Sequence, residues 1–227
     1  MRNGLVMASA ALVLIGLRTD PALAADEPVA LVEDVIGAPD GIDPMDYLAM
    51  GRVLHFKAKE GVIISYLGSC VRERIIGGRA TIGTQESAVA GGTVQRDKVP
   101  CDGGRLRLST EQAAKSGVVV FRAPPRSPQS NAEQIERTLY GLSPLVDIHG
   151  GGKLVIERLD QPNERLELDL PAARLVRGAF YDFDKAGLSL VAGATYRASA
   201  NDRSVVFKVD PFAQPGQAPL AGRLLRF

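Results

Sequence analysis

Cys70 and Cys101 are the only cysteines in this 227-residue sequence. In an oxidising compartment, a single pair of this kind is normally bridged. Cys70 follows an apolar run typical of a buried strand, and Cys101 follows Pro100 just before a Gly-Gly turn. A sheet that folds back on itself would bring two such strand ends within disulfide reach. The alternative is a redox-active or metal-binding pair, although the spacing is far from Cys-x-x-Cys and no histidine is adjacent.

The two histidines, His55 and His149, are the only other side chains suited to proton transfer near neutral pH. We expect His55 on the polar face of a strand and His149 in a glycine-rich turn, in different modules. Neither has cysteines or acids at zinc-ligand spacing. The sequence also has no Gly-x-Ser-x-Gly elbow and no phosphate-binding P-loop. We therefore assign no catalytic residue, metal ligand or cofactor.

The acidic residues leave a second function open. The run Asp182-Phe183-Asp184 faintly resembles the start of a calcium loop, but Lys185 and Ala186 stand where further oxygen ligands are needed. We interpret this run as a solvated turn. A pair of carboxylates elsewhere could support a hydrolase acting on cell-wall or polysaccharide substrates, because such enzymes need two acids across a cleft.

The first residues have the pattern of a secretory signal peptide, residues 1–24. Arg2 precedes an apolar run from 5 to 17, and Ala22-Leu23-Ala24 supplies the small residues of a cleavage site between Ala24 and Ala25. The run is too short to span a bilayer, which needs about 20 apolar residues. We expect a periplasmic or secreted protein with no integral membrane segment after cleavage.

Composition argues against nucleic acid as a partner. Removing residues 1–24 takes two basic and one acidic residue from totals of 27 and 26, so the mature net charge is zero. Such a chain has no field to attract a polyanion. Trp is absent and aromatic residues make up 5% of the sequence, so stacking platforms for bases or sugars are scarce.

The chain predicts an all-β fold of two small antiparallel modules. Residues 25–51 form an acidic lead-in, which we interpret as a solvated segment; the alternative is a docking tail for a basic partner. Within it, Asp43-Pro44 opens one or two helical turns. Residues 52–123 form a meander of short strands punctuated by Gly-Gly pairs at 77, 91 and 103, since glycine supplies the positive φ of tight turns. The three prolines at 124, 125 and 128 indicate a stiff linker over residues 124–131.

The second, sandwich-like module covers residues 132–227. Ser130 and Glu133 have the spacing of a capping box for a short helix through Leu139. The rest alternates as strands do, and Asn201-Asp202 predicts a hairpin. Three apolar residues after that turn would share one face: Val205, Phe207 and Val209.

The stretch from 51 to 121 carries a pattern of strand, Ser65-Tyr66-Leu67, Cys70, Gly-Gly turns and Cys101-Asp102-Gly103-Gly104. It resembles β-rich exported proteins of proteobacteria and is distantly similar to the periplasmic FecR-type domain. The resemblance covers about a third of the chain, implies short strands alternating with glycine turns, and assigns no functional residue. Together these features predict an exported, non-enzymatic binding or scaffold protein with a protein or cell-envelope partner.

Overall fold

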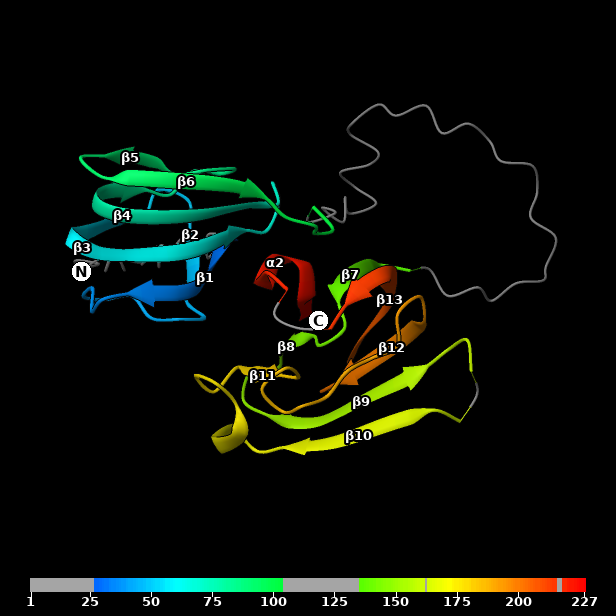
Figure 1. The fold of residues 1–227 in the computed structure, drawn as a ribbon. Coiled ribbons are helices and arrows are strands. Elements are labelled where there is room, and N and C mark those ends of the chain that lie inside the picture. Colours follow the sequence, from blue (N-terminus) through cyan, green and yellow to red (C-terminus); the bar gives the residue numbers. More distant parts are fainter. Residues whose placement is uncertain (1–26, 104–134, 162, 216–217) are drawn as a thin grey trace, which may run out of the picture.

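The computed structural model describes residues 27–103, 135–161, 163–215 and 218–227. These residues confirm the all-β class, since nearly all regular structure is strand. The predicted signal peptide, the Ala24–Ala25 cleavage point and the linker at 124–131 lie outside the described residues. We call residues 27–103 the first module and residues 135–227 the second module (Figure 1).

The first module is one six-stranded antiparallel sheet ordered β2-β1-β3-β4-β5, with β6 pairing β4 beside β5. Its strands are β1 (Pro28–Ile36), β2 (Tyr47–Ala49), β3 (Val53–Tyr66), β4 (Val71–Thr81), β5 (Ala88–Ala90) and β6 (Thr93–Lys98). A core built around Ile64, Tyr66 and Ile75 packs against this sheet.

The acidic lead-in is not a solvated segment, and this prediction was wrong. Residues 28–36 form β1, which lies between β2 and β3 and buries Ala30, Leu31 and Val32 completely. The helical turns expected after Asp43-Pro44 are replaced by a turn and the short strand β2. β2 pairs with β1 at the edge of the sheet, and this pairing outweighs the weak local helix signal.

β3 and β4 bend sharply at one shared irregularity. Their register runs from Val53↔Thr81 to Phe56↔Gly78, then resumes at Gly61↔Ile76. Residues 57–60 of β3 therefore bulge out opposite Gly77 alone. Gly77 and Gly78 have φ of +68° and +72°, so this pair is a bend inside β4 and not the predicted turn before a strand. The pair at 91–92 does separate β5 from β6, as predicted.

The second module packs a five-stranded sheet, β10-β9-β12-β13-β7, against a three-stranded sheet, β11-β8-β14. Its elements are β7 (Arg137–Gly141), β8 (Leu145–Asp147), β9 (Gly152–Arg158), β10 (Arg165–Leu170), η1 (Ala172–Arg174), β11 (Phe180–Asp182), β12 (Thr195–Ala200), β13 (Arg203–Gln214), α2 (Leu220–Arg223) and β14 (Leu224–Arg226). The predicted hairpin across Asn201-Asp202 is confirmed as β12–β13. Val205, Phe207 and Val209 all lie in the core, as expected.

Two predictions for this module were wrong. The helix through Leu139 is absent where the structure describes it, because Arg137–Gly141 is the strand β7. The sheets are also not purely antiparallel: β13 pairs β7 and β14 pairs β8 in parallel. Both parallel partners come from distant parts of the chain, so local patterns could not reveal them.

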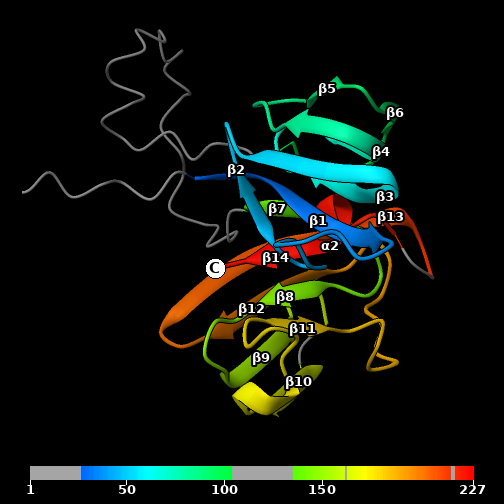
Figure 2. The ribbon, with the colours of Figure 1, turned by 90° about the vertical axis from the view of Figure 1, so that its left-hand side faces the viewer.

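The two modules share a third apolar cluster. Leu31 and Met45 of the first module pack with Leu145, Phe180 and residues of α2 and β14. Figures 1 and 2 both show α2 lodged between the two modules. The sequence had left open whether the modules share a core, and this cluster joins their interiors.

Polar bonds reinforce that junction. Glu33 on β1 accepts hydrogen bonds from Ser65 Oγ (2.5 Å), Arg72 Nε (2.6 Å) and the main-chain N–H of Leu220 at the start of α2 (2.8 Å). Arg177 of the second module bridges Asp43 and Asp46 at 2.8 and 2.6 Å. These contacts tie the acidic stretch to the second module.

Candidate functional site

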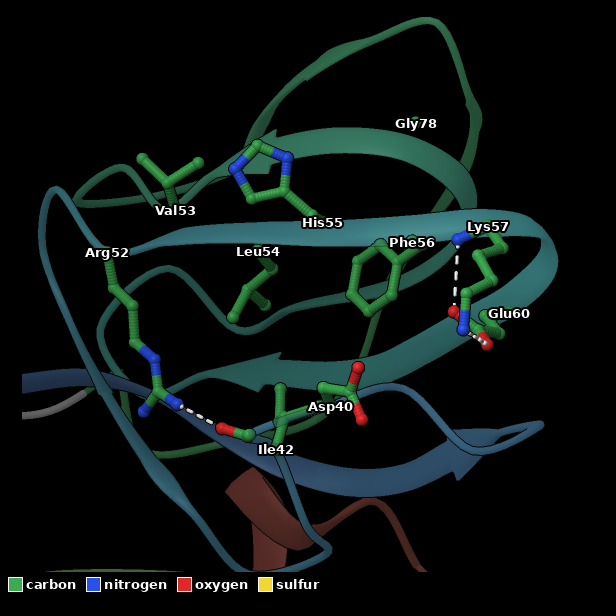
Figure 3. Close-up of a pocket in the computed structure, with 11 residues that line it drawn as sticks. Asp40, Ile42, Arg52, Val53, Leu54, His55, Phe56, Lys57, Glu60 and Gly78 are labelled. Atoms are coloured by element: carbon green, nitrogen blue, oxygen red, sulfur yellow. Dashed lines mark hydrogen bonds and ion pairs between the residues drawn. The ribbon is translucent and has the colours of Figure 1, made fainter.

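A groove of about 510 Å³ lies beside the first half of β3 (Figure 3). One wall is β3 itself, and the other is the loop at residues 40–42 that follows β1. Glu60 and Gly78 lie where the groove meets the bulge. We define the β3 groove by its lining residues: Asp40, Gly41, Ile42, Arg52, Val53, Leu54, His55, Phe56, Lys57, Glu60 and Gly78.

The groove runs along the edge of β3 and not over one face of the sheet. Neighbouring residues of a strand point to opposite faces. Leu54 and Phe56 are buried and point toward Ile42, whereas Val53 and His55 point to the other side of the strand (Figure 3). A hollow lined by consecutive residues of both sets lies beside the strand's edge.

Charged groups lie at both ends of the β3 groove. At one end, Arg52 Nη2 donates to the carbonyl oxygen of Gly41 on the opposite wall at 2.7 Å. At the other end, Lys57 Nζ lies 3.1 Å from Glu60 Oε1, and the Lys57 main-chain N–H donates to Glu60 Oε2 at 3.0 Å. The two ends therefore differ in net charge: one holds the Arg52 guanidinium, and the other holds the Lys57–Glu60 ion pair with the Asp40 carboxylate nearby.

The Lys57–Glu60 pair shifts both groups toward their charged forms. The hydrogen bonds from the Lys57 main chain and ammonium lower the pKa of Glu60. The Glu60 carboxylate, aided by the nearby charge of Asp40, raises the pKa of Lys57. Glu60 is thus an ionised acceptor near neutral pH.

The two histidines lie in different modules. His55 lines the β3 groove, on the exposed face of its strand, as predicted. His149 belongs to the second module, where its Nδ1 lies 2.7 Å from Asp147 Oδ1. Asp147 also accepts a hydrogen bond of 2.6 Å from the Tyr47 hydroxyl across the module junction. His149 therefore adjoins the junction and does not complete a site with His55.

Cys70 and Cys101 lie at disulfide distance, with their Cα atoms 5.5 Å apart. Cys70 occupies a turn after β3 with φ of +55°, and Cys101 follows β6. Val99 N–H donates to the Cys70 carbonyl at 3.0 Å, so the end of β6 is held directly over Cys70. The pairing of β6 with β4 is what brings these strand ends together.

The run at Asp182 does enter a turn, but its first two residues, Asp182 and Phe183, are buried and not solvated as expected. Both oxygens of Asp182 are bonded by Arg223 of α2, at 2.6 and 3.3 Å, and both side chains are buried. Because Arg223 already bonds both Asp182 oxygens, they are not available to bind a cation. In the part of the chain that the structure describes, no three His, Cys, Asp or Glu side chains gather as a metal would require.

A second hollow, of about 690 Å³, lies between the modules. Its lining combines charged groups, Glu27, Asp102, Arg137 and Arg226, with apolar residues such as Leu67 and Leu139. The β3 groove is the better-defined site, since described residues bound both of its walls and both of its ends.

Of the residues that line the β3 groove, the sequence analysis named only His55 as a candidate, and it did not predict the groove. The signal that could have found it is the sequence Arg52–Lys57, which alternates polar and apolar residues and leads to a Glu-Gly pair typical of a bulge. The opposite wall could not be predicted in this way, because residues 40–42 lie outside this sequence pattern and come to lie beside β3 only when the chain folds.

The chain matches no protein-family model, no curated protein and no solved structure. Among the described residues, no helix has the length and apolar character needed to cross a membrane. The class that the fold defines is therefore an all-β protein of two joined modules with a groove along a strand edge.

Proposed function

We propose that this chain is an exported, non-enzymatic binding protein, periplasmic or secreted, that holds a protein partner of the cell envelope in the β3 groove. The observation that carries the proposal is the groove itself, with an apolar floor and oppositely charged ends. Such hollows, mostly apolar with a few placed polar groups, are the usual form of binding sites.

The cysteine pair supports the expected location. Two cysteines at disulfide distance in a chain with no others favour an oxidising compartment, where such bridges persist. The disulfide, the signal peptide and the similarity to the FecR-type domain stay predictions. Each agrees with export, and none of them names the partner.

A hydrolase is the alternative, and Asp40 and Glu60 are the acids that line one groove. A glycosidase of this kind needs one carboxyl whose pKa is raised, so that it can donate a proton. The pKa of Glu60 moves the other way, because Lys57 bonds its carboxylate. Glu60 suits the role of an acceptor, which favours binding over hydrolysis.

The test is capture of envelope proteins by the immobilised mature protein and two variants. Arg52→Glu reverses the charge at one end of the β3 groove, and Arg165→Glu makes the same change on the distant strand β10. A partner retained by wild type and Arg165→Glu but lost by Arg52→Glu supports the proposal. Equal capture by all three proteins would contradict it. Turnover of a cell-wall substrate that Glu60→Gln abolishes would instead establish the hydrolase.

A further inference from the structure

One edge of β3 changes its partner half-way along the strand. From Gly61 to Tyr66, β3 pairs with β1 on one side and β4 on the other. From Val53 to Phe56, β4 is its only strand partner among the described residues. The first half of β3 therefore has an open edge, and the β3 groove lies along it.

One hydrogen bond shows which residues in the first half of β3 direct their main-chain groups toward β4. The Ile82 N–H donates to the Arg52 carbonyl at 2.9 Å. In an antiparallel pair, every second residue directs both its N–H and its C=O toward the same neighbour. Leu54 and Phe56, two and four residues beyond Arg52, therefore direct their main-chain groups toward β4.

The residues between them face the other way. Val53 and His55 direct their N–H and C=O groups away from β4, toward the β3 groove. The main-chain N–H of Lys57 also points away from β4, since the Glu60 carboxylate accepts it. The edge thus offers main-chain donors and acceptors at the spacing of an extended chain.

We propose that the edge of β3 at residues 53–57 binds an extended peptide of the partner protein as an added antiparallel strand. This inference rests on the proposed function and specifies how the groove holds its partner. In strand addition, main-chain hydrogen bonds supply affinity and alternate side chains supply specificity. The added strand would be about five residues long, or roughly 17 Å.

Charge complementarity specifies the order of the peptide's residues. Within the described residues, Arg52 has no carboxylate and Asp40 no cation within 4 Å, and they lie toward opposite ends of the groove in Figure 3. Every strand pair of this sheet is antiparallel. An antiparallel peptide would begin beside Lys57 and end beside Arg52. It should therefore carry a basic residue near its N-terminal end and an acidic one near its C-terminal end.

The opposite wall favours a single chain over a second copy of this protein. Residues 40–42 stand across the groove from Leu54 and Phe56, and the Arg52–Gly41 hydrogen bond ties the two walls together. A lone extended peptide can enter such a channel, whereas the edge of another sheet brings its neighbouring strands with it.

Synthetic peptides test the inference on the mature full-length protein, with binding followed by NMR titration. The probe is acetyl-Lys-Val-Thr-Val-Thr-Glu-amide, and the control exchanges its Lys and Glu. We expect the control to bind at least fivefold more weakly. Two further probes carry N-methyl groups on alternate amides. One should lose binding at least tenfold and the other should keep it, because only alternate amides face β3.

A matched pair of variants tests the same point from the protein's side. His55→Pro removes an N–H that faces the groove and leaves the hydrogen bonds to β4 in place. Proline is tolerated on an edge strand at such a position, because no ladder bond depends on its N–H. His55→Ala removes the imidazole and keeps the N–H. We expect His55→Pro to weaken the probe at least tenfold and His55→Ala less than threefold, with both variants melting cooperatively. Should His55→Pro fail to fold, the N-methylated peptides decide alone.

The failures of the two proposals are distinguishable. Equal binding of both N-methylated peptides would overturn strand addition. If, in addition, Arg52→Glu still released the captured envelope partner, the proposed function would stand without this mode of binding. A concentration-dependent dimer that His55→Pro dissociates would assign the edge to a second copy of the chain and overturn the inference.

Discussion

Replacing Tyr47 with Phe removes one hydroxyl from the junction between the two modules. That hydroxyl donates to Asp147 Oδ2 at 2.6 Å, and Asp147 is only 7% exposed. The aromatic ring remains in place, because it packs against Phe180 with ring centroids 5.6 Å apart and lies under the Arg226 guanidinium. The substitution therefore isolates a single hydrogen bond between modules.

The expected cost follows from the charge of the acceptor. A hydrogen bond to a charged group contributes about 1.5–3 kcal/mol, and its loss leaves a buried carboxylate oxygen without that donor. Each 1.4 kcal/mol corresponds to a factor of ten in an equilibrium constant. If the modules open as one unit, the opening equilibrium of core amides should rise about 10- to 150-fold in both modules.

Hydrogen exchange followed by mass spectrometry measures this directly, because peptides from β3 and β4 report on the first module and peptides from β12 and β13 report on the second. Tyr181→Phe is the matched control, since its hydroxyl has no hydrogen-bond partner among the described residues. Faster exchange confined to one module, or a change below threefold in both, would refute a shared opening unit.

Three other changes have defined outcomes. Cys70→Ser should lower the free energy of unfolding, measured in urea, by about 3–4 kcal/mol, because the bridge would close a loop with a sequence separation of 31. Reduced wild type should unfold like the variant, and two free thiols in freshly purified protein would contradict the bridge. Burial raises the pKa of Tyr66 to about 12, above its ordinary value of 10.0. The free energy of unfolding that this shift contributes is present below pH 10 and should be lost as pH rises toward 12. The loss is at most about 1.4 kcal/mol per pH unit. Tyr66→Phe should show a shallower decline in urea unfolding, and an equal slope would exclude this cause. Limited proteolysis should cut first between Pro124 and Asn131, whose sequence is typical of an exposed linker, and resistance there would argue against one.

Local sequence patterns predicted what depends on neighbours in the chain. The hairpin at Asn201-Asp202 is an example, since both residues take positive φ, of 46° and 61°, as a tight turn demands. The cysteine pair is another, because two strand ends beside glycine turns had few other ways to meet. The alternation of Val205 and Phe207 also identified their buried face correctly.

Predictions failed where distant residues compensate for a local signal. Seven acidic residues with no Lys or Arg made residues 25–51 look solvated, yet the side chain of one of them, Glu33, is only 9% exposed. Ser65, Arg72 and the N–H of Leu220 satisfy its oxygens, and the last of these is 187 residues away. A buried charge needs such partners, and a local pattern cannot show that they exist. The parallel pairing of β7 with β13 escaped prediction for the same reason.

The β3 groove arises from one irregularity that the sequence only hints at. Where residues 57–60 bulge against Gly77, β3 turns away from β1, whose pairing ends at Ile36↔Gly61. A side chain at Gly61 would collide with the carbonyl of Ile75, so only glycine lets the two strands resume pairing after the bulge. The same bulge places Glu60 at the end of the groove, where it caps the N–H of Lys57. The bend, the open edge and the charge at its end are therefore one structural feature, and a partner that recognises one of them meets all three.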